Sequence, residues 1–172
     1  MSMNKKKIII VFFCVILSAS CNNRTNNKTL PLDNHLKENL ISDVFTEGSI
    51  DAYNSFLFNY PDDIRIVSLS VTMAEQHGYG KACSDFFYTM YSSFNHDPIN
   101  IDSATQKYLL SYLYKGVDLN DTDCVWIICK LFLTGTFVEK DTSVAKQYLT
   151  KIYPSTEVET LYWPYIKKHP NL

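Results

Sequence analysis

From residue 33 onward, hydrophobic residues recur every three or four positions, which is the spacing of amphipathic helices. Leu36, Leu40 and Val44 share one such face, and Gly48 follows it as a helix end. No segment alternates convincingly between apolar and polar residues, as a half-buried strand does. The same spacing predicts further helices over residues 50–57, 62–76, 81–94, 102–115, 121–133, 141–153 and from 156 onward.

Short connections rich in Gly, Pro and Asp separate these predicted helices. Helices joined by tight turns lie antiparallel to their neighbours in sequence. The predicted fold class is therefore all-α, with antiparallel helical hairpins stacked in a row as a short solenoid. Residues 33–172 are expected to form this single domain.

Three helix boundaries are predicted from particular residues. The helix that begins at Asp102 and Ser103 is expected to end before Gly116. Thr156, with Glu159 three residues later, has the form of a capping box that starts the last helix. Pro164 is then expected to kink or end that helix, because proline lacks the N–H that a helix interior needs.

The N-terminus carries a different pattern. Three lysines precede an apolar run from Ile8 to Leu17, and the small residues Ser18, Ala19 and Ser20 stand directly before Cys21. A basic start, an apolar core and small residues before a cleavage point are typical of an export signal. The run is short of the roughly 20 residues that a helix needs to cross a bilayer, which disfavours an uncleaved anchor. A signal cut without lipidation is the other alternative.

This segment resembles a bacterial lipoprotein signal, although Ser18 stands where that family usually has Leu. The resemblance implies that residues 1–20 are removed and that Cys21 becomes the first mature residue. It further implies diacylglycerol and an acyl chain on Cys21, with no other cofactor. Since Asn22 follows the cysteine rather than Asp, the sorting rules of the family imply the outer membrane. No acidic cluster of the kind that some lineages use for surface display follows Cys21, which implies the periplasmic side.

Residues 21–32 are polar and hold few apolar side chains, so we expect a flexible tether between the lipid and the domain. After residue 20, the chain carries 13 Lys and Arg against 18 Asp and Glu. Affinity for nucleic acid comes mostly from basic residues at phosphates, so this acidic chain is not expected to bind it. The membrane is expected to be reached through the lipid alone.

The most specific internal pattern lies between residues 124 and 152. In order, its positions hold a small residue, an apolar residue, an aromatic residue, a glycine, an apolar residue, an aspartate, an alanine and an aromatic residue. These are Cys124, Ile128, Phe132, Gly135, Val138, Asp141, Ala145 and Tyr148. Cys124, Ile128 and Phe132 share one helical face, and Gly135 permits the chain to leave that helix. Asp141 can accept backbone N–H bonds at the start of the next helix, and Ala145 permits close helix packing.

This spacing resembles the Sel1-like repeat, a relative of the tetratricopeptide repeat. That family has a second Gly where this chain has Phe137, and often Ala where it has Ile152, so we expect a bulkier loop and a wider helix pair. Upstream, Ala104, Tyr108, Tyr112 and Gly116 repeat the first-helix spacing, and residues 74–82 resemble a tetratricopeptide hairpin. About three repeats are needed for a stable stack, which this length allows.

Three cysteines remain beside Cys21 in the chain after residue 20. Cys124 and Cys129 are five residues apart and point to different helix faces, so they cannot readily chelate a metal or bridge each other. Buried, unpaired thiols are the favoured interpretation. A disulfide from Cys83 to Cys124 or Cys129 stays open, because the cell envelope permits disulfides.

No metal site or enzymatic motif is indicated. Residues 118–123 begin like a calcium loop but lack its Gly and its final Glu, so helix capping by Asn120 or Asp121 is expected instead. The four histidines have no partner at metal-binding spacing, and His77 is expected to be solvated. Ser84 and Asp85 lie close to His77 in sequence, but no oxyanion feature supports a triad.

Twelve tyrosines and ten phenylalanines exceed what one face of each helix can hide. The run from Leu161 to Tyr165 either packs over the end of the stack or contacts a partner, since tyrosine serves well in both settings. Stacked hairpins usually bind peptides or proteins, so a protein partner is expected and an enzyme is not. Lipoproteins with Sel1-like repeats resemble neutralisers of antibacterial phospholipase effectors, which implies an immunity or adaptor role. An envelope assembly or structural role, or an enzyme acting on envelope polymers, are the alternatives.

Overall fold

The structure is a computed structural model that describes residues 31–169, with side chains from residue 34. Residues 35–172 group as one unit, to which the description refers. The export signal, Cys21 and the tether lie outside the described residues. No helix in the described range is both long and apolar enough to cross a membrane.

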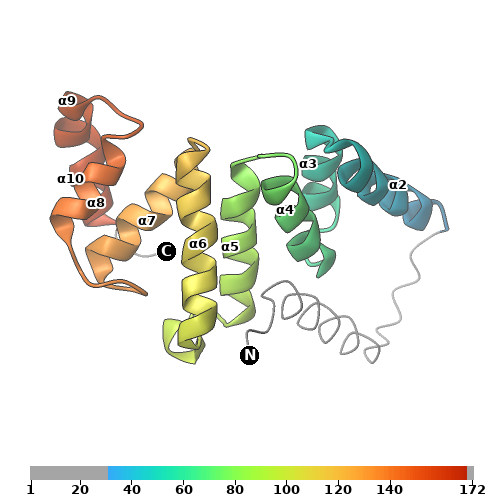
Figure 1. Cartoon of the computed structure of the whole chain (residues 1–172), viewed down its shortest axis with the longest axis horizontal. Helices are drawn as coiled ribbons and strands as arrows, with labels where there is room; N and C mark the ends of the chain where they lie inside the picture. Colours follow the sequence, from blue (N-terminus) through green and yellow to red (C-terminus); the bar gives the residue numbers. More distant parts are fainter. Residues whose placement is uncertain (1–30, 170–172) are drawn as a thin grey trace, which may run out of the picture. The chain divides into compact units, whose positions relative to one another are not determined.

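All regular structure between residues 31 and 169 is helical, and the predicted all-α class is confirmed (Figure 1). Neighbouring helices pack as sequential antiparallel pairs. The elements are α2 (Pro31–Glu47), α3 (Ile50–Asn59), α4 (Arg65–Glu75), α5 (Lys81–Ser93), η1 (Pro98–Asn100), α6 (Ser103–Asp118), α7 (Thr122–Thr134), α8 (Thr142–Leu149), α9 (Ser155–Glu157), the π-helical η2 (Val158–Tyr162) and α10 (Trp163–Lys168).

Aspartates at three loop ends start the central helices. The carboxylates of Asp102, Asp121 and Asp141 each accept backbone N–H groups in the first turn of α6, α7 and α8, respectively. A short acceptor at this position satisfies donors that the helix itself cannot. The sequence prediction that an Asn120–Asp121 pair caps a helix is thus confirmed for Asp121.

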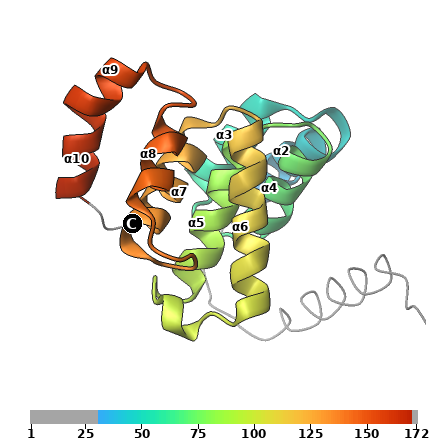
Figure 2. The ribbon, with the colours of Figure 1, turned by 60° about the vertical axis from the view of Figure 1, so that its left-hand side comes forward.

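We group helices α3 to α8 (Figures 1 and 2) into two layers by their contacts with the second helix along the chain, which are extensive between α5 and α7 and consist of side-chain contacts in the other pairs. The odd-numbered layer holds α3, α5 and α7: Tyr53 of α3 reaches Asp85 of α5, and α5 packs directly on α7. The even-numbered layer holds α4, α6 and α8, joined by an ion pair between Glu75 and Lys115 and by ring contact between Tyr114 and Tyr148.

The hydrophobic core lies between these layers. Its largest fully buried side chains come from both of them: Tyr53, Phe56, Leu69, Met73, Phe86, Phe87, Leu109, Leu113, Ile127, Ile128, Leu131 and Leu149. Burial of a side chain of this size contributes roughly 1.5–3 kcal/mol relative to exposure, so the core holds the two layers together.

The prediction that the helix beginning at Asp102 and Ser103 ends before Gly116 is wrong, because α6 continues to Asp118. Gly116 lies where α6 meets both α5 and α7. A Cβ atom there would lie 2.2 Å from Cys124 Sγ and 3.0 Å from Cys83 Cβ. The glycine therefore permits close helix approach instead of ending the helix.

The predicted capping box is also wrong. Helix α9 begins at Ser155 without a side-chain cap, Thr156 lies inside it, and Glu159 forms an ion pair with Lys146 of α8. Pro164 does not end the helical segment. The π-helical η2 precedes it, and Pro164 falls in the first turn of α10, where its missing N–H costs least.

Two other predicted boundaries shift by a few residues. Helix α8 ends at Leu149 rather than near Tyr153, since the chain continues in tighter turns that join Lys151 N–H to the Tyr148 carbonyl. Helix α4 begins at Arg65 rather than Asp62, because the carboxylate of Asp63 accepts the Arg65 backbone N–H.

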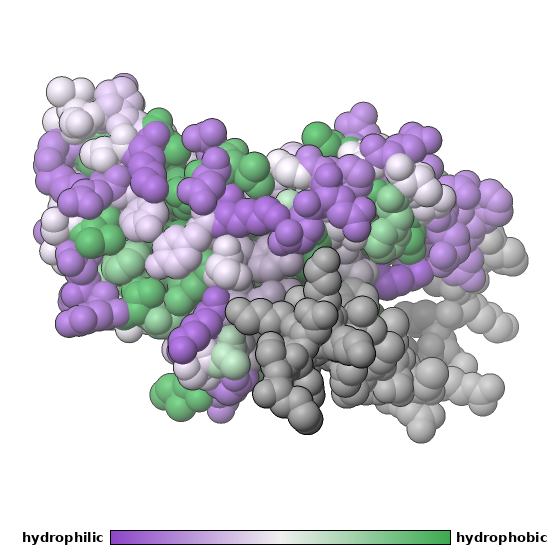
Figure 3. Space-filling model, viewed as in Figure 1, coloured by the Kyte–Doolittle hydropathy of each residue, from purple (hydrophilic) through white to green (hydrophobic). Residues whose placement is uncertain are grey.

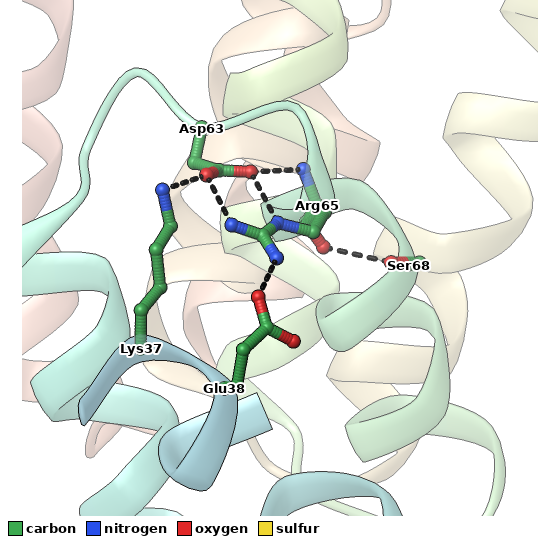
Figure 4. A network of polar contacts seen from close by, with 5 residues as sticks. All are labelled: Lys37, Glu38, Asp63, Arg65 and Ser68. Atoms are coloured by element: carbon green, nitrogen blue, oxygen red, sulfur yellow. Dashed lines mark hydrogen bonds and ion pairs between the residues drawn. The ribbon is translucent and has the colours of Figure 1, made fainter. Parts of the chain in front are cut away.

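A network of charged side chains fastens α2 to the start of α4 (Figure 4). Arg65 donates from Nε and Nη2 to the two oxygens of Asp63 at 3.0 Å each, and from Nη1 to Glu38 at 2.8 Å. Lys37 Nζ lies 2.5 Å from the same Asp63 carboxylate. Burial opposes ionisation of Asp63, but the hydrogen bonds from Arg65 and Lys37 outweigh it and hold the pKa of Asp63 well below its usual range.

Candidate functional site

The eight repeat-motif residues of the sequence all lie in the α7–α8 hairpin. Their shared role is structural: Cys124, Ile128 and Ala145 are buried, Val138 is partly buried against the core, and the rings of Phe132 and Tyr148 stack with centroids 5.8 Å apart. Gly135 ends α7 with a φ of 81°, and Asp141 accepts the N–H groups of Ser143 and Val144. These residues therefore build the hairpin from inside.

Phe137 takes the place of the second glycine of the Sel1 pattern. Its φ is 62°, a left-handed conformation that costs a residue other than glycine of the order of 1 kcal/mol or more. Its ring packs against Phe87 and Tyr91 of α5, with centroids 6.4 Å and 5.8 Å away. The bulkier loop that the sequence predicts thus becomes an additional contact between α5 and the α7–α8 hairpin.

The upstream spacing does not place equivalent helices together. Helix α6 holds Ala104, Tyr108, Tyr112 and Gly116, which repeat the first-helix spacing of α7, yet α6 lies in the even-numbered layer and α7 in the odd-numbered one. Helix α5 is the layer neighbour of α7. In each of the pairs α3–α4, α5–α6 and α7–α8, the first helix therefore lies in the odd-numbered layer and the second in the even-numbered layer.

The cysteines of the domain are free and buried. Burial raises the pKa of Cys83 to about 11 and that of Cys129 to about 12, and it raises the pKa of Cys124 further still. Such thiols stay protonated and behave as small hydrophobic side chains. The structure thus agrees with the favoured interpretation and holds no bridge from Cys83.

One surface of the odd-numbered layer combines aromatic and charged side chains, and we call it the α5–α7 face. It consists of Lys81, Asp85 and Tyr88 from α5 with Asp123 and Trp126 from α7. The ring of Tyr88 is 44% exposed and Asp123 is exposed. The two helices bring these residues together across 35 positions of sequence or more, which is why no local motif predicts them.

A buried hydrogen-bond network fixes Asp85 from behind. Tyr53 O–H donates to Asp85 Oδ2 at 3.0 Å, its oxygen lies 2.8 Å from Ser70 Oγ, and Lys81 Nζ lies 2.6 Å from Asp85 Oδ1. Burial raises the pKa of Asp85, while Lys81 and Tyr53 oppose that rise. Asp85 therefore joins α3, α4 and α5, and it is held rigidly at the base of the face.

Electrostatic interactions connect the two helices of the face. Burial raises the pKa of Tyr88, and the carboxylate of Asp123 raises it further. The Tyr88 hydroxyl therefore stays protonated at neutral pH and can donate a hydrogen bond. Lys81 is drawn to Asp85 and, more weakly, to Asp123. The face offers a hydroxyl donor and two carboxylates beside large rings.

Trp126 marks the edge of the face, where the C-terminal segment docks. Its ring meets those of Tyr153, Tyr162 and Tyr165 with centroids 6.3, 5.8 and 6.1 Å away, and its Nε1–H donates to the Tyr153 hydroxyl at 3.1 Å. The terminal aromatic run divides into packed and exposed residues, and its contact with a partner stays a prediction. Tyr162 and Trp163 pack against the core, whereas Leu161 and Tyr165 are exposed.

Other sequence candidates contribute no site. His77 is exposed, as expected, and lies against Gly48, whose added Cβ would meet the imidazole. No three His, Cys, Asp or Glu side chains within residues 34–169 are placed to hold a metal ion. An open, shallow pocket is lined by Leu133, Thr134, Lys140 and Lys167.

Comparisons with known proteins add no assignment to this geometry. No family model matches the chain, and neither a curated protein nor a solved structure matches it.

Proposed function

We propose that the protein is a lipid-anchored protein of the bacterial cell envelope that binds a protein partner through the α5–α7 face of a short Sel1/tetratricopeptide-like solenoid. The single observation that carries the binding proposal is the exposed Tyr88 beside Asp123, on a base held by the buried Tyr53–Asp85 network. Tyrosine and tryptophan on a preformed surface are typical of protein interfaces, because large rigid rings lose little entropy on binding.

The solenoid proposal is supported by the alternation of helices between two layers, with α3–α4, α5–α6 and α7–α8 as its units. The Sel1 spacing of residues 124–148 fits the last of these. In such stacks the helices of one layer share a continuous surface, which suits an extended protein segment. An adaptor or immunity role is the form of binding that the lipoprotein signal and this repeat together favour.

The binding proposal is tested by capturing partners from solubilised envelope. We compare the wild-type chain with Tyr88→Ala/Asp123→Asn, and use Tyr108→Ala/Asp118→Asn on α6 as the matched control. Tyr108 is exposed to a similar extent, 49% against 44%, but lies in the even-numbered layer. We expect the first variant to lose its partner at least tenfold and the control to keep it. Equal recovery by all three chains would contradict the proposal.

The anchor is tested by palmitate labelling of the wild type and Cys21→Ser. We expect label on the wild type alone, and the same label on both chains would rule out lipidation at Cys21. The identity of the captured partner separates the two binding roles: a secreted toxin indicates immunity, and a component of an envelope machine indicates assembly.

A further inference from the structure

The two ends of the helical row carry opposite charge. Residues 35–65, which form most of α2, all of α3 and the start of α4, hold six Asp and Glu against two Lys and Arg. Residues 142–169, which form α8 to α10, hold four Lys against two Glu. These segments lie at opposite ends of the row (Figure 1). A chain with one acidic and one basic end is electrostatically complementary to another copy of itself.

Each end also exposes large apolar side chains. At the acidic end, Phe58 is 85% and Ile64 62% exposed, and Leu36, Phe45 and Ile50 are exposed as well. At the basic end, Leu161 is 60% exposed and Tyr165, four residues later, is 58% exposed. Figure 3 shows purple, polar residues with green, apolar ones between them over α2 and α3. Apolar residues inside a rim of charge are the usual composition of a protein interface.

The basic end offers a place for such side chains. Its open pocket is lined by Leu133 and Thr134 at the end of α7, by Lys140 from the loop, and by Lys167 from α10. Leu133 is the apolar residue of this lining, and its two lysines suit carboxylates. Lys167 and Lys168 are both exposed there.

We propose that this chain associates head to tail with a second copy of itself, the α2–α3 end of one copy docking on the α8–α10 end of the next. The contact uses two different surfaces of the same chain, so it is heterologous and extends into a ring or an open filament. This inference does not depend on the α5–α7 face.

Charge reversal at each end tests the proposal on the full chain, purified in an uncharged detergent. Asp43→Lys/Glu47→Lys makes α2 basic, and both positions are exposed outside the Lys37–Asp63–Arg65 network. Lys167→Glu/Lys168→Glu makes α10 acidic. Lys107→Glu, exposed on α6, is the matched control. Sedimentation velocity over a hundredfold range of concentration measures the weight-average mass.

We expect the weight-average mass of the wild type and the control to increase with concentration at 0.1 M NaCl. Both should dissociate at 1 M NaCl, because the Debye length falls from about 10 Å to about 3 Å. Each reversed variant should remain monomeric alone, because the α2 reversal leaves the α2–α3 end close to neutral and the α10 reversal makes both ends acidic. A mixture of the two variants should associate again. Circular dichroism checks that each variant is folded. The proposal would be overturned if the wild type were monomeric at every concentration, or if the reversed variants associated as well as the wild type.

Discussion

The contacts that join the helices within a layer differ in kind between the two layers. In the odd-numbered layer, α3 and α5 are joined by a hydrogen bond from the fully buried Tyr53 to Asp85, whose side chain is 13% exposed, and α5 and α7 pack directly on each other. In the even-numbered layer, α4 and α6 are joined by Glu75 and Lys115, whose side chains are 48% and 31% exposed. Buried hydrogen bonds fix a geometry, whereas exposed ion pairs contribute little.

This difference explains why only one layer offers a candidate site. Asp85, three residues before Tyr88 on α5, is held by Tyr53 and Lys81, and α5 packs directly on α7, which carries Asp123. The even-numbered helices also expose a ring, that of Tyr108. It packs edge to face against the rings of Phe86 and Tyr112 in an aromatic cluster. The comparison predicts that substitutions in the odd-numbered layer cost more stability than matched ones in the even-numbered layer.

The largest effect is expected at Gly116, where both layers meet. Gly116→Ala should lower the free energy of unfolding by about 2 kcal/mol, because the added methyl would overlap Cys124 and Cys83. Urea unfolding measures the change. Ser111→Ala, exposed on the same helix, is the control and should stay within about 0.5 kcal/mol. If both variants were equally stable, the close approach of α6 to α5 and α7 would be wrong.

Tyr53→Phe is the next most costly change. It removes the donor to Asp85 and the partner of Ser70 without altering the packing of the ring, so we expect a loss of about 1–3 kcal/mol. Tyr114→Phe in the even-numbered layer is the matched control, with an expected loss below about 0.5 kcal/mol. Equal losses would remove the distinction between the layers.

Acid should weaken the attachment of α2 to α4. The folded-state pKa of Asp63 lies below its unfolded value of about 3.9, so its stabilisation is present above pH 4 and is lost as the pH falls through the folded pKa. Asp63→Asn should remove about 1–2 kcal/mol at pH 7 and flatten the acid limb of the stability profile. Asp43→Asn, exposed on α2, serves as the control. If Asp63→Asn lost stability at low pH as the wild type does, Asp63 would not be the group responsible for the acid dependence.

The smallest effect is expected from the exposed pair of the even-numbered layer. Lys115→Met removes the contact with Glu75 and should change the free energy of unfolding by less than about 1 kcal/mol. The difference from the wild type should shrink further in 1 M NaCl, because salt screens exposed charges. A larger, salt-independent loss would show that the two layers are held alike.

The sequence predicts local structure well where one residue dictates one conformation. Asp121, Asp141 and Gly135 end or start helices as expected, since capping depends only on neighbouring backbone groups. Gly116 is a glycine like Gly135, but it permits a close contact between helices instead of ending one. Glu159 forms an ion pair with Lys146 of α8 instead of capping the start of its own helix. A local pattern cannot distinguish these uses.

The candidate site depends wholly on tertiary arrangement. Tyr88 and Asp123 belong to no motif, and the layer to which a helix belongs follows from packing that the spacing of α6 does not reveal. The Asp63–Arg65 pair is visible in sequence only as two charges two residues apart. Their partners Lys37 and Glu38 lie more than 20 positions away.

The most direct test of the central claim, that the α5–α7 face binds a protein, is photo-crosslinking in intact cells. A photoreactive phenylalanine analogue replaces Tyr88 in one chain and Tyr108 in another, positions of similar exposure in opposite layers. We expect position 88 to yield a covalent adduct with a different protein, and Asp123→Asn in the same chain to weaken it at least fivefold. An adduct from position 108 and none from position 88 would contradict the account.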